Sequence, residues 1–167
     1  VLIAGAGPAG ARVAELISLK GIPATLVDCL KSPYQNSFSS AVVPIKALFD
    51  LSIPIDSVSS YWNSWNIIDP QGKSYQWSSH SHPLGAVLDF GTLRKYMWNN
   101  ANKAGANVLI GWTVKSVLNA DEKVIVQLKS PGGRVHKKTF KWFVDATGTK
   151  RRFIRTFQHQ NYNDDPL

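Results

Sequence analysis

A glycine-rich segment near the start of the chain limits the fold more than any other feature. Residues 5–10 read Gly-Ala-Gly-Pro-Ala-Gly and follow a short apolar run at residues 1–4. A continuous apolar run of this kind is typical of a strand that is buried on both faces. Helical spacing of apolar residues then continues to Lys20, and Gly21 ends it. The residues that this spacing places on the buried side of the helix are Ala9, Val13, Leu16 and Ile17.

A second apolar run, at residues 24–28, completes a strand–helix–strand unit. Such a unit joins two parallel strands by a right-handed crossover and predicts an α/β fold. In this setting the glycine spacing is typical of a dinucleotide-binding turn. Gly5 would allow the tight turn, Gly7 would leave room for a pyrophosphate, and Gly10 would let the helix pack closely on the strand.

Two further residues, Pro8 and Asp28, fit the same interpretation. Pro8 suits the first turn of a helix, where free N–H groups and the helix dipole attract a phosphate. Asp28 stands at the end of the second strand, about 20 residues after the last glycine, where an acid accepts hydrogen bonds from an adenosine ribose. A carboxylate there disfavours the 2′-phosphate of NADP, but it does not separate NAD from FAD. The alternative is a glycine-rich turn that only links a strand to a helix.

The middle of the chain, residues 31–90, differs in character because serine, proline, asparagine and aromatic residues dominate it. Residues 61–68 and 74–77 predict two strands around a turn at residues 69–73. We interpret this part as an insertion that begins a substrate-side layer. Its aromatic residues could wall an apolar cavity, and packing in a core explains them equally well: Tyr61, Trp62, Trp65, Tyr75 and Trp77.

The rest of the chain returns to regular helix and strand patterns. A helix is predicted over residues 92–104, with Thr92 as its cap and Gly105 after its end. A third parallel strand, a three-stranded β-meander and a last buried strand follow. The expected fold class is therefore α/β, with a Rossmann-like parallel sheet and a meander. The strands predicted after the helix cover residues 107–111, 113–118, 124–129, 135–140 and 142–145.

Several segments resemble one known family in their order and spacing. They are the glycine-rich segment, Leu93-Arg94 at the start of the predicted helix, Trp112-Thr-Val114, and Val144-Asp-Ala-Thr-Gly148. Together they resemble the N-terminal, FAD-binding portion of FAD-dependent oxidoreductases of the aromatic hydroxylase and geranylgeranyl reductase type. The resemblance covers residues 1–30 and 88–150. It implies a Rossmann-like FAD-binding domain in which residues 31–90 are an inserted, partial substrate layer.

The resemblance also implies a cofactor and a set of site residues. It implies FAD, with NAD(P)H as a candidate external reductant, and an oxidoreductase of the monooxygenase or reductase type. Asp28 would hold the ribose, Arg94 would face the FAD phosphates or the flavin edge, and Val114 would meet the adenine through its backbone. Gly148 would let the chain pass close to the cofactor. The residues that would hold the pyrophosphate are Gly5, Ala6, Gly7, Pro8, Ala9 and Gly10.

For two of these positions a plain structural role is the alternative. Arg94 could be a solvated arginine on a helix, and Thr147-Gly148 could be an ordinary turn at the end of a strand. No catalytic residue is assigned, and no metal site is expected because His80 and His82 lack partner ligands in the sequence.

The sequence departs from the family pattern in three ways. The family usually has glutamate where Asp28 stands and often a basic residue where Cys29 stands. The halogenase signature is absent, because Trp62-Asn-Ser-Trp65-Asn-Ile67 has the wrong spacing. A Gly-Asp motif that lies further downstream in the family is absent before Leu167. We therefore expect residues 1–167 to be a single FAD-binding domain and a fragment of a longer chain.

Composition suggests one alternative function and bears on where in the cell the protein is expected. The net charge of +8 and the pI near 9.7 suggest an anionic partner such as a nucleic acid. No nucleic-acid-reading motif is present. The expected partner is a small molecule, and the aromatic residues of the middle segment could wall a cavity for an apolar one. The single cysteine excludes an internal disulfide, and we expect its thiol to be buried. No segment is long and apolar enough to span a bilayer, which favours a cytoplasmic protein, or one peripheral to a membrane. The basic residues concentrate late in the chain: Arg134, Lys137, Lys138, Lys141, Lys150, Arg151, Arg152 and Arg155.

Two other classes of function stay open on the sequence. One is an NAD-dependent dehydrogenase domain, against which the Gly-Pro-Ala-Gly loop and the Asp-Ala-Thr-Gly segment argue. The other is a non-catalytic nucleotide-binding or interaction module whose basic end contacts an anionic partner. The substrate, the oligomeric state and the choice between hydroxylation, desaturation and reduction cannot be read from the residues.

Overall fold

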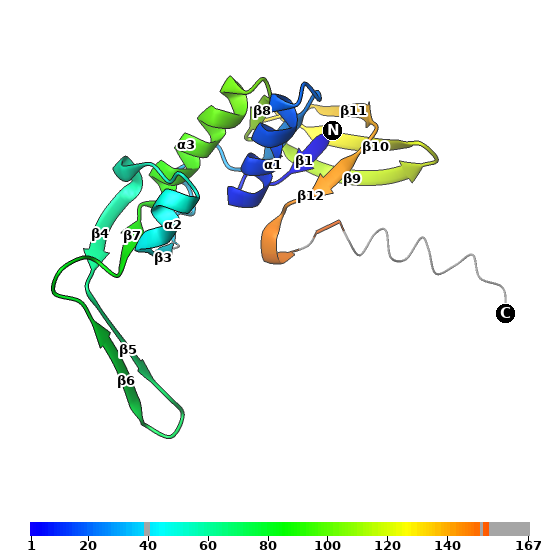
Figure 1. Cartoon of the computed structure of the whole chain (residues 1–167). Helices are drawn as coiled ribbons and strands as arrows, with labels where there is room; N and C mark the ends of the chain where they lie inside the picture. The colour runs from blue at the N-terminus through cyan, green and yellow to red at the C-terminus, as the bar shows by residue number, and fades with distance from the viewer. Residues whose placement is uncertain (39–40, 151, 154–167) are drawn as a thin grey trace. The chain divides into compact units, whose positions relative to one another are not determined.

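The computed structural model describes residues 1–38, 41–150 and 152–153 (Figure 1). Its contacts divide into two compact units. The first unit comprises Val1–Gln35 and the described residues from Met97 onward, and the second unit is Asn36–Tyr96. One helix, α3 (Phe90–Lys103), supplies residues to both units.

A four-stranded parallel sheet forms the centre of the first unit. Its strands are β1 (Leu2–Ala4), β2 (Thr25–Asp28), β8 (Asn107–Ile110) and β12 (Phe143–Asp145), in the order β12-β1-β2-β8. Because β1 has a partner on each side and is covered on both faces, all three of its residues are buried. The α/β class and the parallel pairing of the predicted strands are confirmed.

The two faces of this sheet contact different elements. Ile3 belongs to a core cluster with residues of the helices α1 and α3, including Ala14 and Trp98. Leu2 and Ala4, on the opposite face, belong to a second cluster with Val126 and other residues of an antiparallel sheet. That sheet contains β9 (Thr113–Ala120), β10 (Lys123–Lys129) and β11 (Val135–Phe140), so the predicted meander is confirmed (Figure 1).

Helix α1 (Pro8–Leu19) packs on the sheet through small residues and through only part of the stripe that the sequence predicts, since Val13 and Ile17 are partly buried against the same core. Its buried residues are Gly10, Ala11 and Ala14, whereas Ala9 and Leu16 are exposed. The reason is the close approach of helix and strand. A Cβ atom at Gly10 would lie 1.9 Å from the carbonyl oxygen of Gly5. Small side chains are the ones that fit on this side, and the larger apolar residues lie further round the helix.

The second unit consists of short antiparallel elements. Strands β3 (Val42–Pro44), β4 (Val58–Trp62) and β7 (Gly85–Leu88) form a sheet in the order β3-β7-β4. Strands β5 (Ser64–Ile68) and β6 (Ser74–Ser78) form a hairpin that extends away from this sheet (Figure 1). The helix α2 (Ile45–Asp50) and the 3-10 turn η1 (Ile55–Ser57) complete the described elements of this unit.

The predicted hairpin is confirmed, but the prediction of one strand over residues 61–68 is wrong. Asn63 separates β4, which pairs with β7, from β5, which pairs with β6. The carbonyl oxygens at the break are used by other segments: Trp62 O accepts from Leu84 N at 2.9 Å and Asn63 O accepts from Ser79 N at 2.8 Å. Pairing partners distant in sequence therefore decide where the strand is divided.

Helix α3 begins two residues earlier than predicted, and its cap is different. The Oδ1 atom of Asp89 accepts a hydrogen bond from the backbone N–H of Thr92 at 2.7 Å. Thr92 is thus the third residue of the helix and the donor in the cap, not the capping residue. Asp89 satisfies one of the N–H groups that every helix start leaves without an intrahelical partner.

Candidate dinucleotide-binding site

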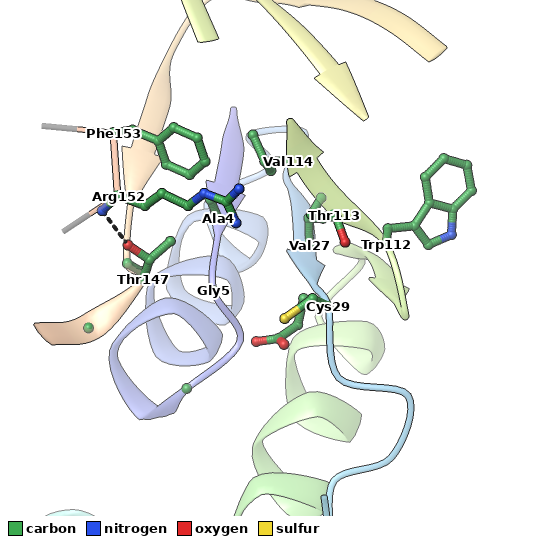
Figure 2. Close-up of a pocket in the computed structure, with 14 residues that line it drawn as sticks. Ala4, Gly5, Val27, Cys29, Trp112, Thr113, Val114, Thr147, Arg152 and Phe153 are labelled. Atoms are coloured by element: carbon green, nitrogen blue, oxygen red, sulfur yellow. Dashed lines mark hydrogen bonds between the residues drawn. The ribbon is translucent and has the colours of Figure 1, made fainter. Parts of the chain in front are cut away.

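A pocket of about 370 Å³ lies at the carboxyl ends of the parallel strands of the first unit (Figure 2). This is the edge of an open parallel sheet where ligands bind, and the volume is in the range of small-molecule sites. The segments that meet at the pocket follow β1, β2 and β12 and include the start of β9. The described residues that line it are Ala4, Gly5, Gly7, Val27, Asp28, Cys29, Trp112, Thr113, Val114, Ala146, Thr147, Gly148, Arg152 and Phe153.

The turn from β1 into α1 has the shape expected of an anion-binding turn. Gly5 has φ of +100°, and a Cβ there would lie 2.3 Å from the carbonyl oxygen of Ala146, so no other residue fits. Gly7 precedes the helix in an extended conformation, and a Cβ there would meet nothing within 4 Å. Pro8 is the first helical residue, and no side chain caps this helix start. The open space beside Gly7 therefore faces helix N–H groups that can bind an anion.

Asp28 lies at this turn, although 22 residues separate it from its partner there. Its Oδ2 atom accepts a hydrogen bond from the backbone N–H of Ala6 at 2.6 Å. Its Oδ1 atom accepts one from the backbone N–H of Leu30 at 2.8 Å. A carboxylate oxygen can accept a second hydrogen bond, so both oxygens keep the capacity to bind ligand hydroxyl groups. The sequence pattern indicates the ribose role of Asp28 but not its bond to Ala6.

A second acidic residue, Asp145, organises the segment after β12. Its Oδ1 atom accepts hydrogen bonds from the backbone N–H of Thr147 at 3.0 Å and from its hydroxyl group at 2.6 Å. Its Oδ2 atom accepts one from the backbone N–H of Phe153 at 2.9 Å. Gly148, within this segment, has φ of +72°. The sequence analysis placed Asp145 in a segment that resembles the family but gave it no role of its own, although an aspartate two residues before a threonine is a recognisable turn signal.

The pocket collects some of the residues predicted for the site and not others. Gly5, Gly7, Asp28, Val114 and Gly148 line it, although they come from four separate segments of the chain. Ala6 is fully buried and contributes its N–H to Asp28, and Gly10 is buried against Gly5. The exposed residues Pro8 and Ala9 stand at the start of α1 and are not among the described lining residues.

Arg94 belongs to the second unit, not to the pocket lining of the first. Its side chain is buried, with 6% of the residue exposed, and its guanidinium lies 4.8 Å from the centre of the Phe90 ring. The alternative of a solvated helix arginine is therefore wrong. A contact between Arg94 and a cofactor stays a prediction.

Nine of the lining residues lie outside the predicted set, and Cys29, Phe153 and Trp112 are three of them. Cys29 is exposed, because β2 ends at Asp28 and the next residue lies beyond the edge of the sheet. The expectation of a buried thiol is wrong. Phe153 is buried and packs edge-on against Phe143 at 5.4 Å between ring centroids. The Trp112 side chain points away from the pocket (Figure 2), and its ring lies 5.1 Å from that of His136.

Two other features bear on the kind of chemistry. No group of three or more potential metal-ligating side chains occurs within the described part of the chain. None of the helices that the structure describes could cross a membrane. Of the late basic cluster, Arg151 and Arg155 lie outside the described residues, whereas Lys137 and Lys138 are exposed on β11.

The arrangement is suited to a nucleotide rather than to a simple anion. The pocket lining includes the open start of a helix beside Gly7, the carboxylate of Asp28 and several apolar side chains: Ala4, Val27, Val114 and Phe153. These surfaces match a phosphate, a sugar and a flat base in that order.

No protein-family model and no curated protein sequence matches the chain. Solved structures do match it. A geranylgeranyl bacteriochlorophyll reductase-like protein from Thermoplasma acidophilum matches with a TM-score of 0.77 and 19% identity, over 88% of this chain and 38% of its own. A flavoprotein/dehydrogenase from Cytophaga hutchinsonii matches with a TM-score of 0.72 and 18% identity, over 94% of this chain and 41% of its own.

A third similar structure is the halogenase PltM, solved in complex with phloroglucinol and FAD. It matches with a TM-score of 0.70 and 17% identity, over 94% of this chain and 36% of its own. This chain therefore spans about two fifths of these proteins or less. At such identities the likeness establishes the fold: the chain has the α/β fold found in part of this reductase-like protein, this flavoprotein/dehydrogenase and this halogenase.

Proposed function

We propose that this chain binds FAD in the pocket of the first unit and serves as the FAD-binding portion of a flavin-dependent oxidoreductase of the monooxygenase or reductase type. The observation that carries the proposal is the hydrogen bond from Ala6 N–H to Asp28. It holds the carboxylate at the end of β2 beside the glycine-rich turn, where a dinucleotide site has the acid that accepts from the ribose. Proteins of similar fold include a flavoprotein and a halogenase solved with FAD.

Each part of the pocket has a task in this proposal. Gly5, Gly7 and the start of α1 hold the pyrophosphate, because the turn is open there and the helix N–H groups are uncapped by a side chain. Asp28 accepts hydrogen bonds from the ribose hydroxyl groups, and Val114 meets the adenine. Gly148 lets the chain pass close to the cofactor, since a Cβ there would meet nothing within 4 Å.

The flavin, when bound, supplies the electron or hydride transfer. The residues of this chain bind and orient it, and none of them is assigned a proton-transfer role. The substrate would be a small, apolar molecule. A second pocket, of about 440 Å³ and wholly within the second unit, supports this class, because its lining is almost entirely apolar: Val42, Val43, Pro44, Trp62, Trp65, Trp77 and Leu84.

Gly7→Val tests the site directly. A Cβ at Gly7 meets nothing in the protein and its φ is −69°, so the substitution fits the fold but fills the space assigned to the pyrophosphate. We expect wild-type protein to bind FAD, measured by calorimetry and by the change in flavin fluorescence, and Gly7→Val to bind it at least about tenfold more weakly.

Gly132→Val is the matched control, because Gly132 lies in the first unit, away from the pocket, and a Cβ there also meets nothing within 4 Å. This variant should bind FAD as wild type does. Equal FAD binding by Gly7→Val and wild type would overturn the proposal. Binding of NAD without binding of FAD by the wild-type chain would favour a dehydrogenase domain instead.

A further inference from the structure

The pocket contains a cation that does not belong to any of the segments resembling the family. Arg152 is exposed, lines the pocket and makes no ion pair with another described residue. We propose that Arg152 stacks its guanidinium against the base of the bound nucleotide and thereby strengthens the binding of that nucleotide. This inference rests on the proposed nucleotide site and adds a residue to it.

The backbone N–H groups of Arg152 and of Phe153 are both hydrogen-bonded, so the side chain of Arg152 enters the pocket from a defined point. Its own N–H donates to the Thr147 hydroxyl group at 3.1 Å, and that hydroxyl donates to Asp145. The N–H of Phe153 donates to the other oxygen of Asp145, and the Phe153 ring is buried against Phe143. One carboxylate thus fixes both the start and the end of the segment that carries Arg152.

The direction of the side chain favours the base over the phosphates as its partner. Figure 2 shows Arg152 extending across the pocket toward Val114, on the Ala4 side of Gly5. The phosphates are assigned to the glycine-rich turn beside Gly7, and the ribose to Asp28, which is hydrogen-bonded to the N–H of Ala6 in that turn. A ligand held at those two points has its base near Val114 and Arg152.

The chemistry of this end of the pocket agrees with a stacked base. Besides Arg152, Thr113 and Thr147, the side chains drawn here in Figure 2 are mostly apolar: Ala4, Val27, Val114 and Phe153. A guanidinium group is planar, delocalised and weakly hydrated, and it stacks on flat aromatic systems more readily than an ammonium group does. Arg152 already lies above the Phe153 ring, at 5.9 Å from its centre.

The test compares the affinities of a ligand with phosphates and a ligand without them. It uses one Arg152 variant that keeps the positive charge and one that removes it. Wild type, Arg152→Lys and Arg152→Gln are titrated with adenosine and with ADP, by calorimetry or by displacement of FAD. Arg134→Lys and Arg134→Gln, on the β10–β11 turn of the same unit, are the controls. Circular dichroism melting confirms that each variant folds.

We expect Arg152→Lys to weaken the binding of adenosine and of ADP by the same factor, roughly 2- to 30-fold, because the charge stays but the planar guanidinium group is lost. The Arg134 variants should bind both ligands as wild type does. The inference fails if Arg152→Lys leaves adenosine binding unchanged while Arg152→Gln weakens the binding of ADP alone, in a salt-dependent way. That result would mean that Arg152 contacts a phosphate. Unchanged binding of both ligands by both Arg152 variants would also overturn it. If wild type binds none of adenosine, ADP and FAD, the proposed function itself fails.

Discussion

Asp28 illustrates how one side chain can serve the fold and the ligand together. Its carboxylate accepts the N–H groups of Ala6 and Leu30, so it fixes the glycine-rich turn to the end of β2. The same oxygens retain lone pairs for a sugar. The family resemblance implies glutamate at this position, and the shorter aspartate still reaches the turn. A ligand would therefore meet an acceptor that the protein has already oriented.

Asp28→Asn should weaken FAD binding and also destabilise the first unit. The amide can accept through its single oxygen, but its NH₂ group must then face either Ala6 N–H or Leu30 N–H, which are both donors. Leaving one of these N–H groups unsatisfied costs about 1–3 kcal/mol, which denaturant unfolding would measure. We expect FAD affinity to fall at least about tenfold.

Asp121→Asn, in the exposed turn between β9 and β10, serves as the control for the loss of one negative charge. Its φ of +51° is a conformation that asparagine tolerates well. Unchanged FAD affinity in Asp28→Asn would show that Asp28 supports the turn but does not contact the ribose.

At the scale of the element, the segment after β12 matters as much as the glycine-rich turn after β1. Ala146 N–H donates to Ala4 O at 2.8 Å, which continues the parallel pairing beyond the strand ends. Asp145 then gathers the donors of Thr147 and Phe153 onto one carboxylate. Two turns from opposite halves of the chain thus form one wall of the pocket.

Asp145→Asn is expected to loosen this segment. Its oxygen can keep both bonds from Thr147, but the NH₂ group then faces the N–H of Phe153, and the two donors cannot pair. We expect a loss of about 1–3 kcal/mol in the free energy of unfolding, together with weaker binding of adenosine, because the hydrogen bond that anchors Phe153 next to Arg152 is lost.

The matched control is Asp69→Asn, which removes an acidic side chain that accepts backbone N–H bonds in the β5–β6 turn of the second unit. That variant should bind adenosine as wild type does. A stable Asp145→Asn variant with unchanged adenosine binding would show that this carboxylate does not support ligand binding in the pocket.

At the scale of the whole molecule, the two units differ in their cores and in their pockets. The first unit contains both core clusters and the whole pocket assigned to FAD. The second unit carries the apolar pocket and the β5–β6 hairpin, whose residues are all exposed. Trp65 and Trp77 are directly opposite each other on that hairpin, as are Ile67 and Tyr75. A ligand of the FAD pocket should therefore stabilise the first unit through contacts within it.

FAD at 100 times its dissociation constant should raise the free energy of unfolding by about 2.7 kcal/mol, because it binds the folded chain alone. For a chain of this size the melting temperature should rise by roughly 5–10 °C, measured by calorimetry. Riboflavin, which lacks the ADP half, should give little increase, and Gly7→Val should show none with FAD. An equal increase with riboflavin would contradict a site built around the ADP half.

The sequence by itself determined the features that local chemistry controls. The apolar runs, the glycine spacing and Asp28 predicted a parallel α/β sheet, and the meander and the β5–β6 hairpin follow from alternating residues and turn signals. These patterns depend on side chains and backbone conformations that are close together along the chain. They can be read without knowing what packs against them.

Only the tertiary structure decided the features that depend on partners far away in the chain. The small residues on the buried face of α1, the division of residues 61–68 at Asn63, the burial of Arg94 and the meeting of Asp145 with Phe153 are of this kind. A helical pattern marks which residues are apolar, but the distance between helix and sheet selects those that fit. The pocket has the same origin, because Arg152 and Gly7 become neighbours of one cavity only when β12 pairs with β1.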